Sequence, residues 1–349
     1  MACRLAALLA TIVVLTACGS SPSGIGTGSP TVSARSPVTS PANSLGGPAP
    51  AGLWVSDIHT NSVTDFPSPP HSTNPIRIVA QVRNPEALAF DARGNLWVGD
   101  GGTSATPPVV VEYSGSAVAH NANPVATISL LGVGISPEGL AFDAQGNLWV
   151  AAGTAVAEYG VASLSRHPRP ARTLSSVILD GPDSLAFDPA GDLWVANYNS
   201  RVLVEYGAQT LQQTHPAYSH TIPLPSGASP FAIAFNPQGN LWVACQNDMI
   251  YEYAAATLGR TSTPSATINM GSLISGGVVG LAFDAQGNLW ASAVGQSAAG
   301  TPEGVVEEYV APSLGRTNTP SATLVASGSN NPGTWALAVF PLPTGTGLH

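Results

Sequence analysis

Four polar side chains at matching points of a repeated sequence could ligate a divalent cation. Glu86, Glu138 and Asp183 each lie three residues before the alanine of an apolar Leu-Ala-Phe phrase, and Asn197 directly follows a Leu-Trp-Val-Ala phrase. Carboxylate and amide oxygens are the ligands that Ca²⁺ and Mg²⁺ prefer in proteins. If these positions converge in the fold, they predict a calcium or magnesium site.

The corresponding positions of the other repeats differ in character. Asp57 and Asp100 also follow a Leu-Trp phrase, whereas the places before the alanine are taken by Phe231, Val279 and Trp335. We therefore expect a binding face that is acidic on one side and apolar on the other. Phe231 and Trp335 could stack on an apolar or sugar-like ligand. The alternative is structural: Asp57, Asp100 and Asn197 cap local turns, and the remaining carboxylates are solvated.

A repeated phrase centred on Leu-Trp defines the elements that must position these residues. Its leucines lie between 43 and 52 residues apart, a period typical of radial or stacked repeats. The six copies are 52–55, 94–98, 146–150, 191–195, 239–243 and 287–290.

Each repeat contains signals for four short strands. Apolar Leu140-Ala141-Phe142 is followed by a turn that contains Gly146 and by apolar Leu148-Trp149-Val150, which predicts a hairpin. A third strand ends in Glu-Tyr, and a fourth apolar run follows a proline. Six such units over residues 50–341 predict an all-β, six-bladed β-propeller with four-stranded blades.

The ends of the repeat region predict how the ring closes. The first unit lacks an inner strand, and the chain ends with a surplus one, so we expect 336–340 to pair with 51–57. The six tryptophans recur at one strand position and are therefore expected to pack between blades, and the recurring Glu of Glu-Tyr is expected to be structural.

The units resemble NHL-repeat propellers. Residues 182–202 follow that family's Pro-x-Gly-Ile-Ala-Val-Asp, Gly-x-x-Tyr-Val-Ala-Asp and Asn-x-Arg-Ile segments, with Trp194 in place of the usual Tyr or Phe. The resemblance implies the fold over 51–340. It leaves activity open, because related propellers include binding platforms as well as metal-dependent gluconolactonase and streptogramin-lyase enzymes. The lyases need a closely spaced His pair, and no His-x-His occurs here.

The N-terminal residues predict export and lipidation. Arg4 precedes an apolar run from Leu5 to Leu15, which is too short to span a bilayer comfortably. Leu15-Thr16-Ala17-Cys18 resembles the lipobox of bacterial lipoproteins, which implies cleavage before Cys18 and its acylation, with palmitate among the acyl chains. The predicted divisions are a signal peptide (1–17), a lipidated Cys18 with a disordered Ser/Pro/Gly linker (18–49), the propeller (50–341) and a tail (342–349).

The net charge and the cysteine content limit the classes of function that the sequence favours. The net charge is −9 and lysine is absent, which disfavours nucleic-acid binding. Cys245 is the single cysteine after the leader and is expected to be a buried apolar residue. The sequence favours a monomeric, lipid-anchored binding module of the bacterial cell envelope, with an unknown protein or small-molecule ligand. The alternative is a divalent-metal-dependent lactonase or hydrolase using Glu86, Glu138, Asp183 and Asn197.

Overall fold

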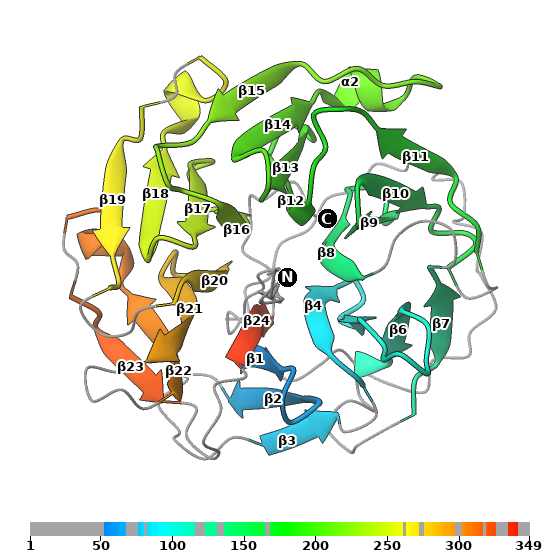
Figure 1. Ribbon diagram of the computed structural model, residues 1–349, viewed down its shortest axis with the longest axis horizontal. Coiled ribbons are helices and arrows are strands. Elements are labelled where there is room, and N and C mark those ends of the chain that lie inside the picture. Colours follow the sequence, from blue (N-terminus) through cyan, green and yellow to red (C-terminus); the bar gives the residue numbers. More distant parts are fainter. Residues whose placement is uncertain are drawn as a thin grey trace, which may run out of the picture.

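The computed structural model describes residues 52–67, 76–79, 82–115, 123–130, 136–164, 168–260, 263–271, 276–296, 302–316, 319–325 and 334–340. Six four-stranded antiparallel sheets surround a central axis (Figure 1). This arrangement is the predicted six-bladed β-propeller. The predicted signal peptide and linker (1–49), Cys18 and the tail (342–349) lie outside the described residues.

The blades repeat one strand order from the axis outward. In blade 1 the order is β24 (Thr334–Phe340), β1 (Gly52–Asp57), β2 (Ser62–Pro67) and β3 (Ile76–Val79). In blade 2 it is β4 (Pro85–Phe90), β5 (Leu96–Asp100), β6 (Val109–Tyr113) and β7 (Ala126–Ser129). In blade 3 it is β8 (Pro137–Phe142), β9 (Leu148–Ala152), β10 (Ala155–Tyr159) and β11 (Arg172–Ser175).

The second half of the ring continues the pattern. In blade 4 the order is β12 (Pro182–Phe187), β13 (Leu193–Asn197), β14 (Val202–Tyr206) and β15 (His220–Pro223). In blade 5 it is β16 (Pro230–Phe235), β17 (Leu241–Cys245), β18 (Met249–Tyr253) and β19 (Ala266–Asn269). In blade 6 it is β20 (Val278–Phe283), β21 (Leu289–Gln296), β22 (Pro302–Tyr309) and β23 (Ala322–Val325).

Helical structure in the described part of the chain is confined to single turns between third and fourth strands. They include α2 (Ala208–Leu211) and the 3₁₀ turns η1 (Ala255–Thr257) and η2 (Ala311–Ser313). None of these helices has the length and apolar character needed to cross a membrane.

The predicted ring closure is confirmed. β24 pairs antiparallel with β1, with Gly52 opposite Phe340 and Val55 opposite Leu337. The amide of Ala336 also donates to Ser56 Oγ at 2.9 Å. The last strand of the chain therefore supplies the inner strand of the first blade, and it begins two residues before the predicted 336–340.

The tryptophans form the predicted seams between blades. Trp97 of blade 2 packs edge-to-face on Phe142 of blade 3, with ring centroids 5.7 Å apart. Three further pairs have the same geometry, namely Trp54–Phe90, Trp149–Phe187 and Trp242–Phe283. All six repeat tryptophans are almost fully buried. Such T-shaped contacts add about 0.5–1.5 kcal/mol each to the energy of burial.

In blades 2 to 6 the hairpin turn that precedes the repeat tryptophan is held by side chains. In blade 2, Asp91 Oδ1 accepts the amide of Asn95 at 2.9 Å, and Asn95 Nδ2 donates to Glu112 Oε1 at 2.9 Å. Gly94 adopts a positive φ of 78°, a conformation that favours glycine. The Asn-to-Glu bond recurs in blades 5 and 6. The repeated Glu is therefore bonded within the blade, in agreement with the predicted structural role.

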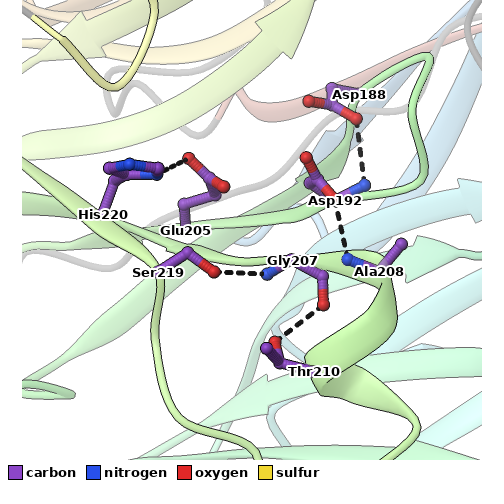
Figure 2. Close-up of polar contacts among 8 residues, drawn as sticks. All are labelled: Asp188, Asp192, Glu205, Gly207, Ala208, Thr210, Ser219 and His220. Carbon is purple, nitrogen blue, oxygen red and sulfur yellow. Dashed lines mark hydrogen bonds and ion pairs between the residues drawn. The ribbon is translucent and has the colours of Figure 1, made fainter.

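Blade 4 departs from this pattern because Asp192 replaces the asparagine. Asp192 Oδ1 still accepts the amide of Ala208 at 2.7 Å, but its carboxylate cannot donate to Glu205 (Figure 2). Glu205 instead lies 2.9 Å from Nδ1 of His220. Burial raises the pKa of Glu205, and Asp192 and Asp188 add to the rise because they place negative charge nearby.

We expect Asp192→Asn to stabilise the protein by about 1–2 kcal/mol, because the new amide can donate to Glu205 and removes a like charge. Thermal unfolding followed by circular dichroism measures the change. The reverse substitution Asn240→Asp in blade 5, which removes a 2.7 Å bond to Glu252, should destabilise by a similar amount. Equal melting curves for Asp192→Asn and the wild type would contradict this explanation.

Candidate functional site

A β-bulge near the start of the inner strands carries the residues that differ between blades. In blades 2 to 6 the register between the first two strands shifts at the second residue of the inner strand. A bulge leaves one residue without a cross-strand partner and re-aims its side chain. The equivalent residue of β24 is Trp335, whose side chain lies outside the described residues. We call the six positions the mouth ring: Glu86, Glu138, Asp183, Phe231, Val279 and Trp335.

The three acidic members of the mouth ring come from adjacent blades and interact with one another. Glu138 and Asp183 are hydrogen-bonded through their side chains, and Glu86 is close enough to both for electrostatic coupling. Glu86 and Asp183 are 2% and 3% exposed, whereas Glu138 is partly exposed. The structure therefore brings the three carboxyl groups together, and Glu86 and Asp183 are not solvated as the structural alternative assumed.

Burial and mutual repulsion favour the protonated forms of these acids. Burial, followed by the charges of Glu138 and Asp100, raises the pKa of Glu86 to about 9. Burial also raises the pKa of Glu138 and, together with the nearby Glu138 charge, that of Asp183. Glu86 further accepts hydrogen bonds from Ser136 Oγ and from Asn84 Nδ2. The hydrogen bond between Glu138 and Asp183 requires that these two carboxyl groups share a proton.

The aspartates after the second strands have structural contacts. Asp57 Oδ1 accepts the amides of His59 and Thr60 at 2.8 and 2.9 Å. Asp100 accepts the amides of Gly102 and Arg83 at 2.8 and 3.0 Å. Burial raises the pKa of Asp100, and these backbone hydrogen bonds oppose the rise. Asp57 matches the turn-capping alternative. Asp100 matches it in its bond with Gly102, but it also binds the amide of Arg83 before β4 and acts electrostatically on Glu86.

Asn197 differs from those aspartates. It is fully buried at the end of β13, and its Nδ2 donates to the carbonyl groups of Val195 and Val202 at 3.3 and 3.2 Å. Its Oδ1 has no hydrogen-bond partner among the described residues. A buried acceptor without a partner is energetically costly, so this atom is suited to receive a donor.

Phe231 was expected to stack on a ligand, but the structure buries it beneath another aromatic residue. Phe231 is 2% exposed, and its ring stacks on Tyr198 with centroids 4.9 Å apart and planes 4° from parallel. The partly exposed Tyr198 therefore presents the accessible aromatic surface, and its hydroxyl is hydrogen-bonded to the side chain of Gln246. Val279 is buried. Cys245 is also buried, as expected, and burial raises the pKa of its thiol, which makes it an inert apolar residue.

The described residues contain no group of three or more His, Cys, Asp or Glu side chains in an arrangement that could hold a metal ion. Glu86, Glu138 and Asp183 are neighbours, but their contacts are hydrogen bonds to one another and to Ser136 and Asn84. The predicted calcium or magnesium site stays a prediction. The bond between Glu138 and Asp183 requires a proton on one of these two groups, whereas Glu86 accepts both of its hydrogen bonds.

Comparison with known proteins supports the fold. No family profile matches the chain, and no characterised protein matches its sequence significantly. A Bacteroides caccae protein of unknown function is similar in structure, with a TM-score of 0.61 and 12% identity over 83% of this chain and 98% of the other. A streptogramin B lyase has a TM-score of 0.51 and 12% identity, covering 83% of this chain and 88% of the lyase.

A third similar structure is a candidate 6-phosphogluconolactonase from Bacteroides uniformis. Its TM-score is 0.56 and its identity 10%, over 78% of this chain and 82% of the other. At such identities the similarity concerns the propeller architecture only. The chain is thus a six-bladed β-propeller, similar in architecture to the lyase and to the lactonase-like protein.

Sequence reasoning missed Tyr198 and Gln246 as parts of the site. Tyr198 follows Asn197 directly and lies in blade 4, the one blade that keeps the Asn-x-Arg segment. That departure from the other repeats was the available signal. The stack on Phe231 depends on how blades 4 and 5 pack, which the sequence pattern alone does not specify.

Proposed function

We propose that this protein is a monomeric, lipid-anchored binding module of the bacterial cell envelope, which captures its ligand at the mouth ring. The observation that supports this proposal is the convergence of Glu86, Glu138 and Asp183 beside the partly exposed Tyr198. Tryptophans, turn aspartates and Glu-Tyr pairs repeat around the ring and have structural contacts. The positions that vary are those that could distinguish one ligand from another.

The binding role is tested by thermal shift against a chemically diverse set of metabolites. A stabilising compound should lose its effect in Tyr198→Ala and Glu138→Gln. It should keep the effect in Tyr218→Ala, a matched control because Tyr218 is 49% exposed in an outer loop. Stabilisation that is retained in both the Tyr198 and the Glu138 variants would place binding elsewhere and refute the proposal.

We expect Cys18→Ala to release the protein from the membrane. The lipobox resemblance assigns the acyl chains to this thiol, and two or more chains are needed for stable anchoring. In a bacterial host, labelled palmitate should be incorporated into the wild-type protein and the protein should sediment with membranes. The variant should be unlabelled and should appear in the soluble fraction. Equal labelling of both proteins would contradict lipidation at Cys18.

The alternative is a divalent-metal-dependent lactonase or hydrolase, and the convergence of three carboxyl groups is the observation that favours it. The proposed binding module predicts that millimolar Ca²⁺ or Mg²⁺ leaves the melting temperature unchanged at neutral pH, because these acids hold protons. A clear stabilisation of the wild type that disappears in Glu138→Ala and Asp183→Ala would favour the metal-dependent enzyme instead.

A further inference from the structure

The ring of Tyr198 has the properties of a stacking platform. One face is covered by Phe231 at a centroid distance of 4.9 Å, and its hydroxyl is held by Gln246. The side chain is thus fixed in position although it remains partly exposed. A fixed and partly exposed aromatic ring offers contact area at little cost in conformational entropy.

A buried hydrogen-bond acceptor lies next to this platform. Asn197 precedes Tyr198 and pairs across the sheet with Pro182, the residue before the bulged Asp183. Its Nδ2 is turned toward β14, where it donates to the Val202 carbonyl. The acceptor of the same amide, Oδ1, is buried, and Asn197 itself lies opposite Pro182 at the start of β12. This Oδ1 lacks a partner among the described residues and needs a donor.

The carboxyl groups of Glu138 and Asp183, close to Tyr198, can donate hydrogen bonds as well as accept them. Glu138 is partly exposed and shares a hydrogen bond with the buried Asp183, so at least one of these two carboxyl groups carries a proton. The platform is close to these acids, since the charge of Asp183 acts on Tyr198. The site therefore combines an aromatic face, an acceptor in need of a donor, and carboxyl groups able to both donate and accept.

Resting on the proposed binding role, we propose that the ligand is a neutral, hydroxyl-rich small molecule that stacks on Tyr198 and hydrogen-bonds to Glu138, both of which are partly exposed. A hydroxyl group donates and accepts at once, so it satisfies both kinds of partner. A sugar ring adds an apolar C–H face for the aromatic platform. A bare metal ion would use neither the aromatic face nor a carboxyl proton. Arg201 lies near Tyr198, so an anionic ligand is the competitor that the test must address.

Saturation-transfer NMR on the full-length protein tests this ligand class with defined probes. The neutral probes are methyl α-D-glucopyranoside, methyl β-D-galactopyranoside and myo-inositol. The charged probes are D-glucuronate and D-glucosamine, and calcium chloride is added alone in a separate arm. At least one neutral probe should bind. Its affinity should fall about fivefold to tenfold in Tyr198→Ala, the loss expected for one aromatic stack.

Two controls keep the result interpretable. Tyr198→Trp should retain binding because it restores an aromatic face, and Tyr218→Ala should bind like the wild type. Circular dichroism must show that all variants fold. If only charged probes or calcium bind, and their binding depends on Tyr198 or Glu138, the proposed neutral ligand class is wrong. The proposed binding face is then still supported. If no probe depends on either residue, both the ligand class and the proposed binding face are refuted.

Discussion

Removing β24 by truncation after Gly333 is expected to abolish the cooperative fold. Ala336, Leu337 and Ala338 are fully buried, and β24 is the strand that pairs with the inner edge of β1 in the described part of the chain. Its loss exposes the backbone of β1 and removes the contacts of β24 with β20 of blade 6 and β4 of blade 2, its neighbours in the ring (Figure 1). Whole domains are stable by only about 5–15 kcal/mol, so the loss of one inner strand should remove most of that stability.

Circular dichroism and size-exclusion chromatography measure the effect of this truncation. The shortened chain should lack a cooperative thermal transition and should associate through the exposed edge of β1. A chain truncated after Phe340, which keeps all of β24, is the matched control and should melt like the full protein. If the shorter chain unfolds in a sharp transition with a melting temperature within a few degrees of the wild type, β24 does not contribute the expected stability.

Glu86→Gln should stabilise the protein at pH 8 and flatten its dependence of stability on pH. The pKa of Glu86 is raised by burial from 4.5 to about 9. Below pH 4.5 the group is protonated in both the folded and the unfolded states. Between these two pH values the unfolded chain releases the proton while the folded protein keeps it, so stability falls as the pH rises and levels off above about 9.

The expected size of this effect is up to several kcal/mol, because each tenfold change in proton affinity corresponds to about 1.4 kcal/mol. Denaturant unfolding between pH 4 and pH 9 gives the slope for each protein. The wild type and Glu86→Gln should converge near pH 4 and diverge at higher pH. Glu138 and Asp183 should leave some slope in the variant, since the pKa of each is also raised.

The exposed Asp180 provides a control for the pH series, because Asp180→Asn should change stability by less than about 0.5 kcal/mol. If Glu86→Gln has the same pH slope as the wild type, Glu86 is ionised in the folded protein at neutral pH. The shared-proton description of the three carboxyl groups would then be wrong.

The blade architecture was predictable because it depends on repeated local signals. Each Leu-Trp phrase marks a second strand, each Glu-Tyr pair ends a third strand, and the surplus strand around Leu337 identified the closure with β1. The mouth-ring positions could also be aligned from the repeats. That alignment was sound because the bulge recurs at the same residue of each inner strand in blades 2 to 6.

The chemistry of the site could not be predicted in the same way because it depends on contacts between blades. The bond from Ser136 to Glu86, the bond between Glu138 and Asp183, and the stacking of Tyr198 on Phe231 each join residues of different blades. Strand periodicity says which face of a blade a residue occupies, but not how far a side chain is from one on the next blade. Asp100 illustrates the limit, since it caps a local turn through Gly102 and also binds the amide of Arg83, 17 residues away.

A crystallographic fragment screen tests most directly whether the mouth ring is the binding face. It is independent of ligand class when neutral, cationic and anionic fragments are all soaked. We predict that fragments collect beside the ring of Tyr198 and the carboxyl group of Glu138. The contradicting result is a mouth ring without fragments while they fill the cavity of about 470 Å³ between blades 4 and 5, which is lined by residues including Glu205, His220 and Arg260.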